Sequence, residues 1–201
     1  QHVDNGMSKD ELLKEHKHVL GLSNINLELA NKNIEVIMGL SGSGKSTLIR
    51  HINRLIEPTA GSILIGGEDV IKMPMEKLRQ FRQQKTAMVF QSFALLPHKT
   101  IMDNVCLGVH LQGIKADEAT KRAKKWIDRV GLTGYEDRYP SQLSGGMQQR
   151  VGLARALTCD TEILMMDEAF SALDPLIRSD MQDLLLELQK ELHKTCLLYT
   201  S

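Results

Sequence analysis

The sequence predicts a single α/β domain with a helical insertion. Residues 34–38 form an apolar run that enters a glycine-rich loop, and residues 47–56 have the pattern of a helix that leaves it. A second apolar run, residues 162–166, ends in two carboxylates, whereas helical patterning dominates residues 92–149 between the two runs. This order is typical of an α/β core that binds a ligand where its strands end.

The composition excludes several classes of protein. Lys and Arg together number 25, as do Asp and Glu, so no global positive field would draw the chain to nucleic acid or to anionic lipid. The three cysteines are far apart in the sequence, which favours reduced thiols over a metal site. No apolar run approaches the ~18 residues that a membrane-spanning helix needs. We expect a protein that serves a membrane, if at all, from its surface and through a partner.

The glycine-rich loop fits the phosphate-binding pattern G-x-x-x-x-G-K-[ST]. Its backbone N–H groups must converge on one anion, which glycines permit, and the N-terminus of the following helix favours negative charge. Lys45 is expected to reach the β- and γ-phosphates of ATP, and the Ser46 hydroxyl to bind Mg²⁺. The residues expected to bind the nucleotide here are Gly39, Ser41, Gly42, Ser43, Gly44, Lys45, Ser46 and Thr47.

Local patterns predict the remaining elements of the first half. Ser8, followed three residues later by Glu11, is a helix start of the capping-box type. Alternating apolar residues and turn residues mark the strands. The predicted elements are a helix over 8–17, a strand over 25–29, a strand over 62–65, a helix over 75–84 and a strand over 86–90.

Helical spacing marks the middle and the end of the chain. Apolar residues recur at this spacing over 119–130, and Gly131 supplies a stop. Asp174 and Pro175 form a helix start, and the apolar residues that follow share one face. That face consists of Ile177, Met181, Leu184, Leu185, Leu188 and Leu192, and residues 196–199 are the last predicted strand.

Two carboxylates end the strand over 162–166. Asp167 is expected to hold Mg²⁺, and Glu168 to orient and deprotonate the water that attacks the γ-phosphate. An Asp-Glu pair after a strand is often only part of a solvated loop. The phosphate-binding loop upstream favours the functional interpretation.

Residues 143–150, Leu-Ser-Gly-Gly-Met-Gln-Gln-Arg, resemble the signature of ATP-binding-cassette (ABC) ATPases. The resemblance implies a P-loop NTPase core with an antiparallel β subdomain and an inserted helical signature subdomain, here at about 92–149 of a single domain over 1–201. It also implies a head-to-tail dimer, in which the signature of one copy covers the ATP of the other. Without the resemblance, Ser-Gly-Gly is only a flexible helix start. The implied signature contacts are Ser144, Gly145, Gly146 and Gln148.

Further site residues follow from the same resemblance. Gln91 resembles the glutamine that touches Mg²⁺ and water, and residues 171–174 resemble the loop that crosses the dimer interface, which adds Asp174 to the nucleotide contacts. Residues 93–97 belong either to the surface that receives a coupling helix of a permease or to a buried core contact. The implied catalytic residues are Lys45, Gln91 and Glu168, and the implied Mg²⁺ ligands are Ser46, Gln91 and Asp167.

The amino-acid sequences of residues 37–41, 88–98 and 166–178 are similar to those of ATPase subunits of glycine betaine/proline importers. This implies ATP hydrolysis that powers uptake of a quaternary amine at the cytoplasmic face of the membrane. The implied partners are permease subunits and, indirectly, a solute-binding protein. Alternatives are an importer ATPase for another amino acid and a nucleotide-binding fragment without turnover. A DNA-repair ATPase would need a coiled-coil or zinc insertion, for which the sequence has no pattern.

The sequence departs from the ABC pattern in two places. The family stacks an aromatic residue on adenine, yet the first aromatic here is Phe81. His16 and His18 are the candidates for that place, although both also fit ordinary surface positions. The family also follows its last core strand with a histidine, where this sequence has Ser201 and ends. We therefore expect the domain to be incomplete at its C-terminus.

Overall fold

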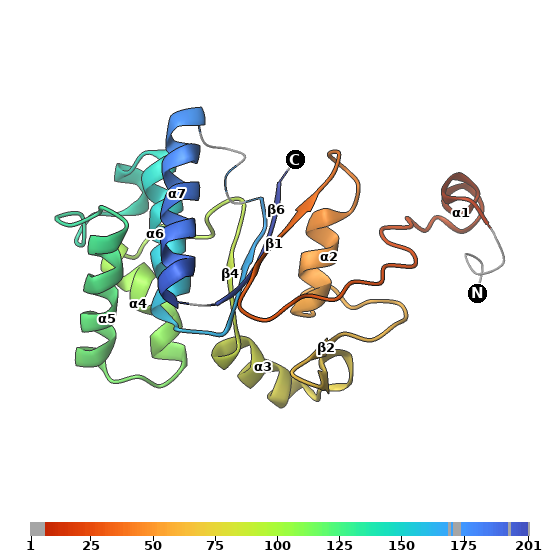
Figure 1. Ribbon diagram of the computed structural model, residues 1–201, viewed down its shortest axis with the longest axis horizontal. Helices are drawn as coiled ribbons and strands as arrows, with labels where there is room; N and C mark the ends of the chain where they lie inside the picture. The colour runs from red at the N-terminus through yellow and green to blue at the C-terminus, as the bar shows by residue number, and fades with distance from the viewer. Residues whose placement is uncertain (1–6, 169, 171–173, 193, 201) are drawn as a thin grey trace.

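A computed structural model describes residues 7–168, 170, 174–192 and 194–200 and confirms the predicted α/β fold (Figure 1). A parallel sheet has the strand order β1-β6-β5-β4, and a small antiparallel sheet pairs β2 with β3. The strands are β1 (Ile34–Met38), β2 (Leu64–Ile65), β3 (Glu68–Asp69), β4 (Thr86–Val89), β5 (Ile163–Met166) and β6 (Thr195–Thr200).

Helices cover both faces of the parallel sheet. Four of them, α4 to α7, gather on one side, α2 lies on the other, and α1 lies at the far end of the molecule (Figure 1). The helices are α1 (Lys9–His16), α2 (Lys45–Ile52), α3 (Met75–Gln84), α4 (Ile101–Leu111), α5 (Ala116–Arg129), α6 (Gly145–Thr158) and α7 (Pro175–Leu192). Short 3-10 turns span Val70–Lys72 and Pro140–Gln142. None of the helices within the described ranges is long and apolar enough to cross a membrane.

The largest hydrophobic core lies between the sheet and α4 to α7. The spacing over 119–130 predicts it correctly, because Ala119, Ala123, Trp126, Ile127 and Val130 are all buried. On α7, Met181 and Leu185 are buried as expected, whereas the side chains of Leu188 and Leu192 lie outside the described residues. A smaller core, on the α2 side, joins Ile49 to Met165 and Leu197.

Two predicted elements differ from the structure by more than two residues at one end or more. Residues 25–29 form no strand, and Ile25 and Leu27 are exposed, because alternation makes a strand only where a neighbouring strand supplies hydrogen bonds. The helix predicted from residue 47 begins at Lys45 and ends at Ile52. Its early start depends on Gly44, whose φ of 93° turns the chain from the loop directly into the helix.

The loop before α4 is held by the side chain of Asn104, which is fully buried. Its Oδ1 accepts a hydrogen bond from the Leu96 N–H at 2.8 Å. Its Nδ2 lies 3.1, 3.1 and 2.9 Å from the carbonyl oxygens of Leu96, Lys99 and Thr100. One amide therefore satisfies backbone groups that the irregular loop leaves unpaired.

Replacing Asn104 with Ala is expected to lower the free energy of unfolding by about 2–3 kcal/mol, because it leaves buried backbone groups without partners. Urea unfolding measures the change. His110→Ala, at an exposed position of the same helix, is the matched control and should change the value by less than about 0.5 kcal/mol. Equal effects of the two substitutions would show that Asn104 does not hold the loop.

Candidate functional site

The phosphate-binding loop joins β1 to α2, as the sequence predicts. Gly42 and Gly44 have φ angles of 78° and 93°, which L side chains rarely adopt. The buried Lys45 ammonium donates hydrogen bonds to the carbonyl oxygens of Gly39 at 2.6 Å and Leu40 at 2.8 Å. Its positive charge is therefore held inside the curve of the loop, where phosphate oxygens would accept from it.

Sheet register brings Gln91 and Glu168 together. Val89 of β4 pairs with Met166 of β5, and both site residues lie two positions beyond this pair. The Gln91 Nε2 donates a hydrogen bond to the Glu168 Oε2 at 2.8 Å. Glu168 has a φ of 51°, which turns its backbone sharply at the strand end. Two residues that are 77 positions apart in sequence thus form one polar pair.

Asp167 is the buried charge of the site, with none of its surface exposed. Its Oδ2 accepts a hydrogen bond from the Nε of Arg50 at 2.9 Å, and the Nη2 of the same guanidinium lies 2.7 Å from that oxygen. Its Oδ1 accepts from the hydroxyl of Tyr199 on β6, which also bonds to the Ser46 hydroxyl. Burial and the hydrogen bond to Asp167 raise the pKa of Tyr199 to about 12, so its phenol stays neutral and donates at neutral pH.

The oxygen atoms near Tyr199 fit a magnesium site. The Ser46 hydroxyl and the Asp167 carboxylate each form a hydrogen bond with the Tyr199 hydroxyl group and so lie near each other. Mg²⁺ prefers oxygen ligands and usually takes only one or two from the protein beside phosphates and waters. The Gln91 side chain reaches the same strand ends through Glu168. Ser46 and Asp167 are therefore suitable ligands, whereas Gln91, the third expected ligand, contacts Glu168.

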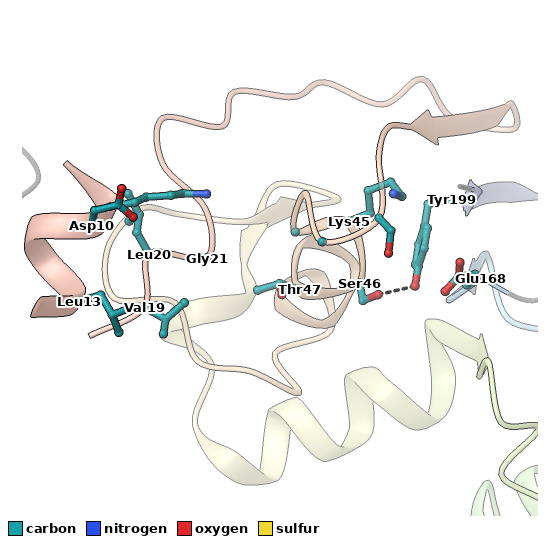
Figure 2. Close-up of a pocket in the computed structure, with 14 residues that line it drawn as sticks. Asp10, Leu13, Val19, Leu20, Gly21, Lys45, Ser46, Thr47, Glu168 and Tyr199 are labelled. Atoms are coloured by element: carbon teal, nitrogen blue, oxygen red, sulfur yellow. Dashed lines mark hydrogen bonds between the residues drawn. The ribbon is translucent and has the colours of Figure 1, made fainter. Parts of the chain in front are cut away.

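A cavity of about 490 Å³ opens over the phosphate-binding loop. One side consists of loop residues, among them Ser41, Gly42 and Lys45 to Thr47, together with Glu168 and Tyr199. The other side consists of Lys9, Asp10 and Leu13 of α1 and the segment 19–21 (Figure 2). His16 and His18, the predicted candidates for an adenine platform, are not among its lining residues. His16 is half-buried and His18 exposed, which fits the alternative of ordinary surface positions.

The signature residues lie at the start of α6 and do not line this cavity. Ser144 caps α6, and its hydroxyl accepts from the Met147 N–H at 3.3 Å. A Cβ on Gly146 would come within 2.9 Å of Ile177 on α7, whereas a Cβ on Gly145 would meet nothing within 4 Å. Of these two glycines, only Gly145 therefore has open space next to its Cα at the beginning of the helix.

Gln148 and Asp174 both have structural partners within the chain. The Gln148 Nε2 donates to the carbonyl oxygens of Pro140 and Leu143, each at 3.1 Å, and so shapes the turn before the signature. The Asp174 Oδ1 accepts from the backbone N–H groups of Leu176 and Ile177, each at 3.1 Å, and caps α7. Ser171, Ala172 and Leu173 of the predicted interface loop lie outside the described residues, as does Ser201.

The loop over 93–97 is partly buried and partly exposed. Leu95 packs against the main core, whereas Ala94 and Pro97 are exposed. Phe93 and Ala94 have positive φ angles of 61° and 46°. The Arg155 guanidinium donates to their carbonyl oxygens, at 2.9 and 2.7 Å, and holds this unusual backbone in place.

Sequence reasoning missed two residues of the site, Arg50 and Tyr199. Arg50 follows Ser46 by four positions, so helical spacing places both on one face of α2 and could have identified it. Tyr199 could not have been found in this way, because its role depends on β6 lying between β1 and β5. Its ring also lies 5.6 Å from the Lys45 ammonium.

Known proteins resemble the whole chain. It is 54% identical over 200 residues to the glycine betaine transport ATP-binding protein OpuAA of Bacillus subtilis, covering 100% of this chain and 48% of that protein. It is 52% identical over 195 residues to ProV of Escherichia coli, a glycine betaine/proline betaine transport ATP-binding protein, covering 97% and 49%. The chain thus spans about half the length of these relatives.

Solved structures agree with these relatives. The dimeric ATP-binding cassette MJ0796, in a post-hydrolysis state with ADP and Pi, superposes with a TM-score of 0.83 at 35% identity, covering 90% of this chain and 79% of that one. The protein cbiO1 of Clostridium perfringens, part of an ABC transporter complex, gives a TM-score of 0.81 at 28% identity, with 92% and 74% covered. Residues 22–171 match the ABC transporter family. Because this match spans more than half of the chain, the chain belongs to the ABC transporter family.

Proposed function

We propose that this chain hydrolyses ATP to power an importer of glycine betaine, proline betaine or a related quaternary amine. The observation that carries the proposal is the hydrogen bond between Gln91 and Glu168. It holds the Glu168 carboxylate in the lining of the cavity over the phosphate-binding loop. The names of OpuAA and ProV support the choice of solute. The solute itself would bind to other subunits.

The residues of the site have different roles in hydrolysis. Lys45 and the backbone of the phosphate-binding loop bind and orient the phosphates. Ser46, Asp167 and Gln91 would hold Mg²⁺, which would supply positive charge against the phosphates. Glu168 orients the attacking water and accepts its proton, and Gln91 holds the Glu168 carboxylate in place.

The second half of the ATP site is proposed to come from another copy of the chain. Ser144 and Gly145 lie at the N-terminus of α6, which favours a γ-phosphate, yet they do not line the cavity of their own chain. A head-to-tail dimer would place them over the partner's phosphate-binding loop. The solved structure of MJ0796 is dimeric, which supports the assembly of two copies.

The proposed link to the membrane runs through the loop over 93–97. It begins two residues after Gln91 and is held by Arg155 of α6, so it connects the end of β4 with α6. Its exposed residues, Ala94 and Pro97, would receive the permease subunits at the cytoplasmic face of the membrane. A solute-binding protein would act on those subunits from the other side.

Glu168→Gln is expected to retain ATP binding and to lower the rate of hydrolysis at least about 100-fold, because the amide cannot accept the proton of the attacking water. Mg²⁺-dependent phosphate release, measured at several protein concentrations, tests this. The wild-type rate should rise more steeply than linearly with protein concentration if two copies build each site. An unchanged rate in the variant would remove Glu168 from its proposed role, and binding without any wild-type hydrolysis would identify a nucleotide-binding fragment without turnover.

Mixing two inactive variants tests the shared site. Lys45→Ala removes the phosphate ligand, and Gly145→Asp places a negative charge at the open face of the signature without a steric clash. Each variant alone should be inactive. A mixture should recover up to about one quarter of the wild-type rate, because half of the dimers then hold one intact site of two. A mixture as inactive as its components would contradict the head-to-tail dimer.

A further inference from the structure

The two side chains best placed to bind Mg²⁺ share a partner within the chain. The Tyr199 hydroxyl donates a hydrogen bond to the Asp167 Oδ1 and forms a second hydrogen bond with the Ser46 hydroxyl. Figure 2 shows the hydroxyl end of Tyr199 directed at Ser46, with Lys45 and Glu168 near the ring. One phenol therefore contacts both oxygen groups that a metal ion would use.

The ring of Tyr199 is anchored in the smaller hydrophobic core. Leu197 and Tyr199 lie on one face of β6, because side chains two positions apart in a strand point the same way. Both pack in the core that contains Ile49 of α2 and Met165 of β5. Only 3% of Tyr199 is exposed, and its backbone pairs with Ile37 of β1. Packing therefore holds the hydroxyl at the site in addition to its two hydrogen bonds.

The position of this hydroxyl conflicts with a metal ion that binds the same oxygens. Mg²⁺ lies about 2.0–2.1 Å from each ligand and demands near-octahedral geometry. An ion that joined the Ser46 hydroxyl to the Asp167 carboxylate would lie between them, where both groups bond to the phenol. The hydrogen bond from Tyr199 also uses acceptor capacity of the carboxylate that the ion would need. The phenol and the ion therefore exclude each other from this position.

Lys45 is paired within the chain in a similar way. Its ammonium group donates to the carbonyl oxygens of Gly39 and Leu40, at 2.6 and 2.8 Å, and lies 5.6 Å from the centre of the Tyr199 ring. The cation expected to bind the phosphates and the oxygens expected to bind Mg²⁺ thus meet at one side chain. A nucleotide with its ion would have to exchange contacts on both sides of that ring.

We propose that Tyr199 competes with Mg²⁺ for Ser46 and Asp167 and so sets the affinity of the site for the ion. The inference rests on the proposed ATPase function. The phenol pairs with the buried Asp167 carboxylate until the ion binds, and the ion then takes over that pairing while the hydroxyl turns away. Tyr199 thus stabilises the fold at the expense of metal affinity. Tyr199→Phe should reverse both effects, because the carboxylate loses a donor and the ion loses a competitor.

The test compares Tyr199→Phe with Tyr135→Phe, which removes the same hydroxyl from an exposed position outside the cavity. Calorimetry gives the dissociation constant of a non-hydrolysable ATP analogue in Mg²⁺ and in EDTA. The gain in affinity from Mg²⁺ should be about tenfold larger in Tyr199→Phe than in the wild type, because the ion no longer displaces a hydrogen bond to a charged group. Tyr135→Phe should keep the wild-type gain. An equal or smaller gain in Tyr199→Phe would overturn the proposal, and a smaller one would identify the phenol as a support for the ion.

Two further measurements follow the phenol and the fold directly. Adding Mg²⁺ to the analogue complex should change the near-ultraviolet absorbance of tyrosine in the wild type and in Tyr135→Phe, but not in Tyr199→Phe. In EDTA without nucleotide, Tyr199→Phe should unfold at a lower urea concentration than the other two proteins. If Lys45→Ala loses the analogue but the gain from Mg²⁺ is the same in the wild type and in Tyr199→Phe, the competition is refuted and the ATP site stands. If the wild type binds the analogue neither in Mg²⁺ nor in EDTA, the proposed function itself fails.

Discussion

The site depends on one buried charge, the carboxylate of Asp167. A fully buried carboxylate is tolerated only where charged or hydrogen-bonding partners replace water. Here the partners come from two other elements, Arg50 of α2 and Tyr199 of β6. These contacts tie α2 and the ends of β5 and β6 together just below the phosphate-binding loop. Removing one partner would leave part of that charge uncompensated, so the geometry of the loop and the packing of the sheet are coupled.

Parallel pairing then decides which polar residues meet. In a parallel sheet the carboxyl ends of neighbouring strands lie at one edge, so the residues that follow β1, β4 and β5 converge there. The register Val89 to Met166 brings Gln91 opposite Glu168 rather than opposite Asp167. The backbone N–H of Asp167 donates to the Val89 carbonyl at 2.9 Å and continues the ladder to that point. Asp167 therefore lies inside the sheet, where its surroundings suit a metal ligand. Glu168 lies at the edge of the sheet, where its surroundings suit a base.

How much the sequence predicts depends on whether a signal is local. The phosphate-binding loop, the buried spacing of α5 and the capping box of α1 follow from neighbours within a few residues, and the structure confirms them. Strand pairing is not local: the alternation over 25–29 has no partner strand, and the place of Tyr199 depends on the strand order. The side of the cavity that α1 and residues 19–21 line was missed for the same reason, because these residues reach the cavity through space and not through a motif.

The arrangement also explains why one chain would hold a nucleotide without completing its site. The phosphate-binding loop and Glu168 lie along a single cavity and suit the phosphates and the attacking water respectively. The signature at the start of α6 is absent from this lining. Groups that cannot reach the γ-phosphate within their own chain can act on it only from another copy. Binding and hydrolysis would then be separable: the first a property of one chain, the second a property of the pair.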